Sequence, residues 1–246
     1  MNNSIIVEGH RGWRSDYPEN SLVSFEAAMD LGVDAFEFDI RMSKDGVPVI
    51  MHDSDTWRVS GEHAVIEKMT LDEIKRLDIG SKIYGEKFAG TRVPTLDEVL
   101  SLVRSKNPNF KLGVEFKSYD EHCVDISVDM LKDYGLFENC WFYCFNARII
   151  KYIKTKYNGR TMGYPDFQMK EFESDSYEYY DELGLSTSFL KSEILGVYLE
   201  KGLPIHFYCA DDEETACLAI SKNASLITAN NPVPLMKVLG RKINTK

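Results

Sequence analysis

Residues 35–53 read AFEFDIRMSKDGVPVIMHD, and their pattern sets the architecture expected for the whole chain. Apolar and acidic residues alternate over residues 35–40, a period that predicts a β-strand. Successive side chains of a strand point to opposite faces, so Glu37 and Asp39 share one face, about 7 Å apart. The predicted strand therefore has one apolar face and one anionic face.

An Asp45-Gly46 turn connects this strand to an apolar run at residues 47–51. A turn this short joins antiparallel strands, because parallel neighbours need a crossover of about a dozen residues or more. We therefore predict a hairpin that extends the second strand of the fold. If the turn has two residues, the register places His52 opposite Asp39.

The residues before this hairpin predict a strand, a loop and a helix. An apolar run at residues 5–8 favours the first strand, and a Gly-His-Arg-Gly loop follows at residues 9–12. Glycines in such a loop let the backbone approach a ligand closely. Asn20 or Ser21 is the expected N-cap of the next helix, and Gly32 is its expected C-terminal residue.

The rest of the chain alternates between strand and helix patterns. Strands are predicted at residues 111–116, 141–145, 161–164, 185–187, 204–209 and 225–228, and helices at residues 96–103, 121–134, 147–157, 171–183, 191–201, 212–222 and 234–239. With the hairpin set aside, these elements form eight strand–helix units, which predict an α/β fold of the (β/α)8 TIM barrel type. A doubly wound open sheet is the main alternative. We prefer the barrel because it gathers the residues at the carboxyl ends of its strands.

We expect residues 1–246 to form a single domain with a small insertion at about residues 54–94, after the second strand. Barrels of this length are commonly one domain, and no low-complexity tract or composition break marks a linker. Within the insertion the hydrophobic period weakens, and only a short helix at residues 71–77 is predicted.

The composition limits the classes of partner. A formal net charge of −10 opposes binding to nucleic acid or to anionic membranes. No apolar run approaches the roughly 18 residues of a membrane span, and no signal segment precedes the first strand. The five cysteines lack C-x-x-C spacing, which indicates reduced thiols and neither disulfides nor a zinc site. We expect a cytoplasmic protein with a small-molecule substrate; the oligomeric state is left open.

Three acidic residues, Glu37, Asp39 and Glu115, are expected at strand ends inside the barrel. Converging carboxylates repel one another, and burying them unpaired is costly. A hard cation relieves this repulsion, and oxygen-only ligands favour Mg²⁺ or Ca²⁺ over zinc, without distinguishing the two. Arg11 and Lys117 beside such a cation form a cradle for a phosphate group.

Two histidines, His10 and His52, follow predicted strands close to this cradle. An unperturbed imidazole pKa of about 6.5 allows one histidine to accept a proton and the other to donate one at neutral pH. The pattern therefore favours general acid–base catalysis on a phosphate ester. We favour His10 as the base and His52 as the acid.

The same residues belong to a series of short motifs. The motifs are His10-Arg11-Gly12, Pro18-Glu19-Asn20, Glu37-x-Asp39, Asp45-Gly46, His52-Asp53, Pro94-Thr95-Leu96-x-Glu98-Val99-Leu100 and Glu115-Phe116-Lys117. This series resembles the glycerophosphodiester phosphodiesterase family, including its small insertion after the second strand. The resemblance implies a TIM barrel that uses a divalent metal to hydrolyse glycerophosphodiesters to glycerol 3-phosphate and an alcohol.

The resemblance also implies roles for individual residues. Metal ligands are Glu37, Asp39 and Glu115, the acid–base pair is His10 and His52, and the phosphate contacts are Arg11 and Lys117. The nucleophile stays open: it is either water or the glycerol hydroxyl of the substrate, acting through a cyclic phosphate that water then opens.

The second half of the chain departs from the family pattern. Cys144-Phe145 stands in place of Ser-Phe, Tyr208-Cys209-Ala210-Asp211 in place of Trp-Thr-Val-Asn, and Ala229-Asn230 in place of Thr-Asp. These positions concern the alcohol side of the substrate, so the preferred headgroup is left open. Trp13, Phe145 and Tyr208 are candidate residues of the substrate pocket, and Trp13 either stacks on the substrate or only packs.

Three alternatives compete with this interpretation. One is a non-catalytic barrel that binds phosphoglycerol compounds, and another is a phosphodiesterase that acts on a different diester. The third is a barrel amidohydrolase, which is disfavoured because the first strand offers one histidine and no H-x-H pair.

Overall fold

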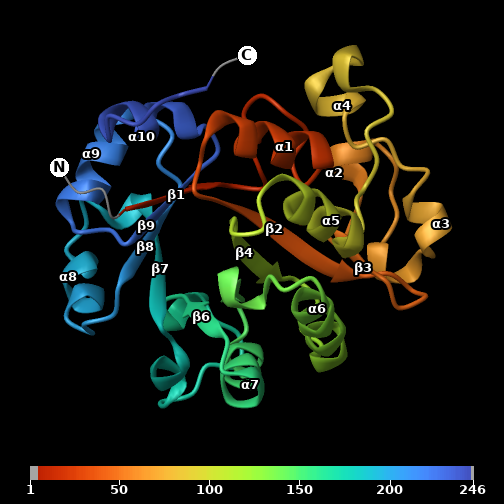
Figure 1. The fold of residues 1–246 in the computed structure, drawn as a ribbon. Helices are drawn as coiled ribbons and strands as arrows, with labels where there is room; N and C mark the ends of the chain where they lie inside the picture. The colour runs from red at the N-terminus through yellow and green to blue at the C-terminus, as the bar shows by residue number, and fades with distance from the viewer. Residues whose placement is uncertain (1–4, 245–246) are drawn as a thin grey trace.

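The computed structural model describes residues 5–244 and shows a closed barrel of parallel strands with helices around it (Figure 1). The barrel strands are β1 (Ile6–Gly9), β2 (Ala35–Met42), β4 (Lys111–Phe116), β5 (Cys140–Tyr143), β6 (Arg160–Gly163), β7 (Glu182–Ser186), β8 (Ile205–Tyr208) and β9 (Leu226–Ala229). β1 pairs in parallel with both β2 and β9, which closes the sheet. The predicted TIM barrel is confirmed, and the open-sheet alternative is wrong.

Helices cover the outside of the barrel (Figure 1). They are α1 (Leu22–Leu31), α5 (Leu96–Lys106), α6 (Glu121–Asp133), α7 (Ala147–Tyr157), α8 (Ile194–Leu199), α9 (Glu213–Ser221) and α10 (Pro232–Val238). The Ser21 hydroxyl caps α1, and Thr95 forms a capping box with Glu98 at the start of α5. Gly32 ends α1 with φ 98°, so the predicted boundaries of α1 are confirmed.

The two faces of β2 have different surroundings. Phe36 and Phe38 are fully buried against Phe25 of α1, with ring centroids 4.5 and 6.1 Å from that of Phe25. Because side chains alternate along a strand, this apolar packing turns Glu37 and Asp39 towards the inside of the barrel. The outer core therefore positions the acidic residues.

β3 (Pro48–Ile50) pairs with β2 in antiparallel orientation, which confirms the predicted hairpin. Residues 44–46 form its turn, and Gly46 has φ 81°. Three-residue hairpin loops place a glycine in this left-handed region. The predicted register is therefore wrong by one residue: Met51, not His52, donates its backbone N–H to the Asp39 carbonyl, at 2.9 Å.

The segment between β3 and α5 consists of short helical pieces. They are α2 (Trp57–Ser60), η1 (Ile66–Lys68), α3 (Leu71–Ile74), α4 (Ser81–Tyr84) and η2 (Glu86–Phe88). Val59 and Ile66 belong to a small apolar core that also includes Val49 and Met51 of the hairpin. The insertion is thus anchored on β3. That residues 1–246 form one domain stays a prediction, and residues 1–4 and 245–246 lie outside the described part.

The α-helix predicted at residues 171–183 is wrong. Between β6 and β7 the described chain makes only 3₁₀ turns, η4 (Asp166–Gln168) and η5 (Ser176–Tyr179). Glu171 has φ 49°, outside the helical region, and its carboxylate accepts a hydrogen bond of 2.7 Å from Asn146. Tyr180 packs into the space left by Gly163, where any Cβ would collide with its ring. These contacts between distant residues override the local helical period.

Further 3₁₀ turns are η3 (Phe137–Asn139) and η6 (Thr187–Phe189).

Two expectations drawn from composition agree with the structure. Each helix in residues 5–244 is too short or too polar to cross a bilayer. All five cysteines are free thiols, as predicted.

We expect Gly113→Ala to lower the free energy of unfolding by about 1–3 kcal/mol, since it overpacks the barrel interior. An added Cβ would collide with the Glu8 carboxylate and lie 2.7 Å from the Tyr143 ring. Urea denaturation measures the change. Gly196→Ala in α8 is the control, because its Cβ would meet nothing within 4 Å. A Gly113→Ala protein as stable as the wild type would contradict the tight packing of this layer.

Candidate active site

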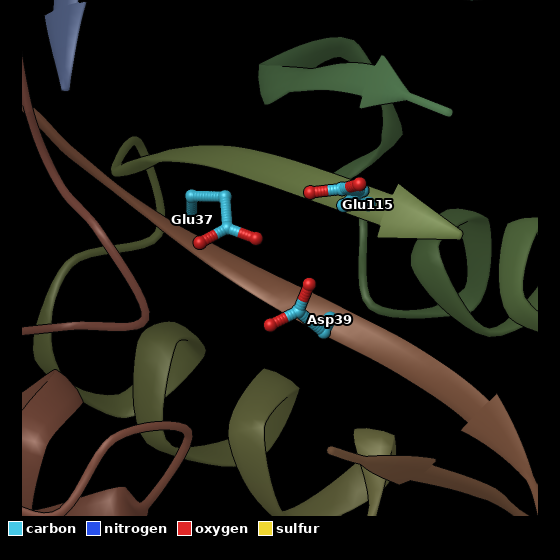
Figure 2. A group of neighbouring side chains, drawn as sticks. All are labelled: Glu37, Asp39 and Glu115. Atoms are coloured by element: carbon cyan, nitrogen blue, oxygen red, sulfur yellow. The ribbon is translucent and has the colours of Figure 1, made fainter. Parts of the chain in front are cut away.

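Three carboxylates converge inside the barrel, those of Glu37, Asp39 and Glu115 (Figure 2). Glu37 and Asp39 share a face of β2, and the pairing of β2 with β4 places Asp39 beside Glu115. One oxygen from each carboxylate lies within 4.8 Å of the others. All three residues are buried, with exposed fractions of 3%, 0% and 6%. The structure thus brings together the three acidic residues selected from the sequence.

Two cations contact this cluster. Lys117 Nζ lies 2.5 Å from Glu115 Oε1 and 3.3 Å from Asp39 Oδ1. Arg11 Nε lies 3.3 Å from Asp39 Oδ2, and the Arg11 backbone N–H donates to Glu37 Oε2 at 2.9 Å. Each carboxylate therefore has a contact with Arg11 or Lys117, but three acidic groups face two side-chain cations.

The loop after β1 and the turn before α1 fix the position of Arg11. Arg11 and Asn20 both have φ 54°, in the left-handed region. Arg11 NH1 donates to Glu19 Oε1 at 2.8 Å, and Asn20 Nδ2 donates to Asp39 Oδ2 at 2.7 Å. The motif at residues 18–20 therefore belongs to the site, although only the family resemblance marked it in the sequence.

The pKa values of the acidic residues differ because their surroundings differ. Burial and the charge of Asp39 raise the pKa of Glu37 well above its ordinary range, and burial raises that of Glu115. For Asp39, burial acts in the same direction, but Lys117 and Arg11 outweigh it and hold the pKa below its ordinary range. Additional positive charge in the cluster would favour the ionised form of Glu37.

The cluster fits a hard divalent cation. Glu37 Oε1 and Asp39 Oδ1 are buried oxygens without a hydrogen-bond partner, which is a costly arrangement unless another group satisfies them. Carboxylate oxygens are the ligands that Mg²⁺ and Ca²⁺ prefer. The buried acidic group is therefore consistent with a divalent metal site, whose ion the donor set does not identify.

His10 is oriented by residues that follow β8 and β9. Its Nδ1 lies 2.7 Å from Asn230 Oδ1, while Asn230 Nδ2 donates to Asp211 Oδ2 at 2.6 Å. Since Asp211 turns the amide nitrogen towards itself, an oxygen faces His10, and Nδ1 must carry the proton. Nε2 then faces the acidic cluster, 3.9 Å from Glu37 Oε2. Burial, with the charge of Arg11, lowers the pKa of His10 to about 3.

His52 follows β3 and has a different partner. Its Nδ1 lies 2.7 Å from Asp53 Oδ1, so Nδ1 carries a proton. The His52 carbonyl accepts two hydrogen bonds from Arg41, at 2.7 and 3.0 Å. Burial lowers the pKa of His52, while Asp39 and Asp53 oppose that change. His52 is thus paired with a carboxylate, whereas His10 is paired with an amide.

One cavity of about 600 Å³, its open mouth included, connects these groups. The residues selected from the sequence that line it are His10, Arg11, Glu37, His52, Glu115, Lys117, Phe145 and Tyr208. Tyr164 also lines it, with its ring stacked on Phe145 at a centroid distance of 3.7 Å and edge-on to Tyr208 at 5.6 Å. The cavity therefore has a charged part and an aromatic wall.

Trp13 does not line this cavity. Its Nε1 donates to Ser15 Oγ at 3.0 Å, and its ring borders a separate groove with Tyr17. His206 is buried, and its Nε2 lies 2.5 Å from Thr228 Oγ1. The structure therefore separates Trp13 from the other candidate pocket residues.

Several residues of the site had no role assigned from the sequence: Tyr164 lines the cavity, Asn230 and Asp211 orient His10, and Arg58 binds Glu19 and Asp53. Asp211 and Asn230 were visible only as departures from a family pattern. Arg58 lies in the insertion, where no periodicity guides prediction. Tyr164 ends a predicted strand, and this position was the only sign in the sequence that it could belong to the site.

A model of the Glycerophosphoryl diester phosphodiesterase family matches residues 10–225. A glycerophosphodiester phosphodiesterase of Caldanaerobacter subterraneus subsp. tengcongensis is 37% identical over 152 residues, which make up 61% of this chain and 61% of that protein. The chain is therefore matched over less than two thirds of this relative's length. YhdW of Bacillus subtilis is 26% identical over 245 residues, with 95% of this chain and 97% of YhdW covered.

Solved structures share the fold. An Oleispira antarctica phosphodiesterase, in complex with the product sn-glycerol-3-phosphate, superimposes with a TM-score of 0.82 and 24% identity over 96% of each chain. At this identity the likeness establishes the barrel and not the chemistry.

We expect the pH dependence of stability to reveal the charge on Glu19. Burial raises the pKa of Glu19, but the hydrogen bond from Arg58 and the charge of Arg11 outweigh burial and lower this pKa to about 2. A lowered pKa contributes stability above the unfolded-state pKa, and this contribution is lost as the pH falls towards 2. For Glu19 it is about 3 kcal/mol at neutral pH. Glu19→Gln should therefore show a flatter fall in unfolding free energy between pH 5 and pH 2, measured by urea denaturation.

The control for this experiment is Glu86→Gln, at an exposed position in η2. It should keep the wild-type pH dependence. A Glu19→Gln protein with the same slope as the wild type would show that Glu19 is not held ionised by its arginines.

Proposed function

We propose, because the chain belongs to the glycerophosphoryl diester phosphodiesterase family, that it hydrolyses glycerophosphodiesters to glycerol 3-phosphate and an alcohol. The observation that carries this proposal is the single cavity lined by Glu37, Glu115, Arg11, Lys117 and both histidines. The Oleispira antarctica phosphodiesterase, which has the same fold, was solved with sn-glycerol-3-phosphate as its product, and this is the product that we propose here. The substrate is a small molecule, and the cytoplasmic location stays a prediction.

Glu37, Asp39 and Glu115 would hold a divalent ion, Mg²⁺ or Ca²⁺. When bound, such an ion supplies positive charge that stabilises negative charge on the phosphate oxygens. The support is the convergence of the three carboxylates and the two buried oxygens that have no hydrogen-bond partner.

Arg11 and Lys117 would bind the substrate phosphate. Both line the cavity, and carboxylates hold both in place: Glu19 binds Arg11 through NH1, and Glu115 binds Lys117 through Nζ. The Arg11 guanidinium matches the geometry of phosphate oxygens, whereas Lys117 acts as a point charge. Anchored cations need little reorganisation when the phosphate gains charge in the transition state.

The partners of the two histidines support different roles. A neutral His10 has its proton on Nδ1, so Nε2 has a free lone pair and can accept a proton from the attacking hydroxyl. Asp53 stabilises a protonated His52 imidazolium, whose Nε2–H can then donate to the leaving alcohol oxygen. We therefore assign His10 as the base and His52 as the acid; either water or the glycerol hydroxyl is the nucleophile.

The aromatic wall would contact the alcohol part of the substrate. Phe145, Tyr164 and Tyr208 offer ring faces and edges on one side of the cavity, and Lys117 Nζ lies 5.5 Å from the Phe145 ring centroid. This short distance supports a wall that adjoins the proposed phosphate position. Headgroup preference would therefore depend on these three rings and not on Trp13.

We expect purified protein to release glycerol 3-phosphate from at least one of glycerophosphocholine, glycerophosphoethanolamine and glycerophosphoglycerol. Release should require Mg²⁺ or Ca²⁺ and stop when EDTA removes the ion, because three acidic residues otherwise face only two side-chain cations. A coupled glycerol 3-phosphate assay measures it. Ligand binding without turnover on all three substrates would favour the non-catalytic alternative, and no binding at all would favour a different diester.

We expect His10→Ala and His52→Ala each to lower kcat by at least about 100-fold, the scale of a lost proton transfer. Glu37→Gln should lower kcat by a similar factor, because it removes a proposed metal ligand. Circular dichroism should show that the barrel stays folded. His122→Ala and Glu86→Gln, at exposed positions, are matched controls and should keep wild-type rates. A near-normal rate in any of the three variants removes that residue from the mechanism.

A further inference from the structure

Arg58 in α2 of the insertion connects two carboxylates that belong to the barrel. Its Nε donates to Asp53 Oδ2 at 2.5 Å. Its NH1 and NH2 donate to Glu19 Oε2 and Oε1, at 2.8 and 2.7 Å. One guanidinium thus binds one carboxylate through two nitrogens and a second carboxylate through the third nitrogen.

Each of these carboxylates orients a different side chain of the proposed site. Asp53 Oδ1 binds His52 Nδ1 at 2.7 Å, and Glu19 Oε1 binds Arg11 NH1 at 2.8 Å. Arg58 itself does not line the cavity. Arg58 therefore contacts the proposed acid only through Asp53, and a proposed phosphate-binding residue only through Glu19.

The position of Arg58 depends on how the insertion folds. Its neighbour Val59 is 2% exposed in the small apolar core that includes Ile66. The Thr56 backbone N–H, at the start of α2, donates to the Ala64 carbonyl at 3.0 Å. Because these contacts fix α2, they also fix the guanidinium that α2 presents to the barrel.

We propose that Arg58 is a positioning residue that couples the insertion to catalysis: through Asp53 it sets the orientation of His52, and through Glu19 that of Arg11. This inference rests on the proposed hydrolysis of glycerophosphodiesters. In that reaction the oxygen of the nucleophile bonds to phosphorus and its proton passes to His10. The bond from phosphorus to the alcohol oxygen breaks, and the leaving oxygen takes a proton from His52. Arg58 touches none of the reacting atoms and acts only by holding the groups that do.

The guanidinium fork is essential to this role. Arginine offers donors on three nitrogens in a fixed plane, whereas lysine has a single charged nitrogen. Arg58→Lys can keep a contact with the buried Glu19, but it cannot also hold Asp53 in the same geometry. The conservative substitution should therefore loosen His52 and leave the charge of the site unchanged.

The test compares two substrates that differ in their leaving group. Glycerophosphocholine releases an alkyl alcohol that needs protonation, whereas the 4-nitrophenyl phosphodiester of glycerol releases a phenolate that does not. We expect Arg58→Ala and Arg58→Lys to lower kcat for glycerophosphocholine by roughly 10- to 100-fold. For the nitrophenyl substrate kcat should fall much less. KM should rise for both substrates in Arg58→Ala, because Arg11 is also loosened.

Two further variants separate the possible results. Arg76→Ala, an exposed arginine of the same insertion, should keep wild-type kinetics on both substrates. Asp53→Asn should show the same dependence on the leaving group. Adding Arg58→Lys to Asp53→Asn should lower kcat little further, because both substitutions break the same contact. Arg58→Lys keeps the test decisive if Arg58→Ala does not fold.

An equal loss of kcat on both substrates, or no loss on glycerophosphocholine, would overturn the positioning role. His52→Ala separates this failure from that of the proposed function. If the loss of kcat depends on the leaving group in His52→Ala but not in the Arg58 variants, only the inference about Arg58 fails. If the wild-type protein hydrolyses neither these two substrates nor glycerophosphoethanolamine nor glycerophosphoglycerol, the proposed function itself fails, and the inference fails with it.

Discussion

Charge balance inside the barrel is the constraint on which the rest of the structure depends. Glu37, Asp39 and Glu115 are all buried, and within residues 5–244 the side-chain cations that lie within 4 Å of their oxygens are Arg11 and Lys117. A buried carboxylate is stable only when charge or hydrogen bonds compensate it. The left-handed backbone at Arg11, the turn before α1 and the insertion all serve to deliver or to hold these compensating groups.

Much of this arrangement could be predicted from the sequence because its signals are local. Alternation over residues 35–40 identified the acidic face of β2, and the packing of the alternating residues Phe36 and Phe38 on Phe25 explains why that face turns inward. Once eight strand–helix units imply a barrel, Glu115 must come close to Asp39, since parallel neighbours in a barrel share one carboxyl end. The strand period of the sequence and the barrel topology were therefore enough to predict the acidic cluster.

The remaining features depend on contacts that no local pattern encodes. The hairpin register follows from the left-handed conformation of Gly46, which adds a residue to the turn. The segment at residues 171–183 has a helical period, but Tyr180 fills the space above Gly163 and Glu171 binds Asn146. The partner of His10 is equally non-local, because Asn230 lies beyond β9. The partner of His52 is the next residue, Asp53, but Asp53 is in turn bound by Arg58 of the insertion.

The barrel closes where the first strand meets the last, and this has a consequence for biosynthesis. β1 pairs with β9, and His10 binds Asn230, 220 residues further along the chain. During translation the acidic residues, both cations and His52 emerge long before the strand that completes the sheet. Contacts between such distant residues form late, because the intervening chain must be ordered first. A nascent chain thus holds every proposed metal ligand before His10 acquires its partner, and the histidine becomes oriented only when the final strand docks.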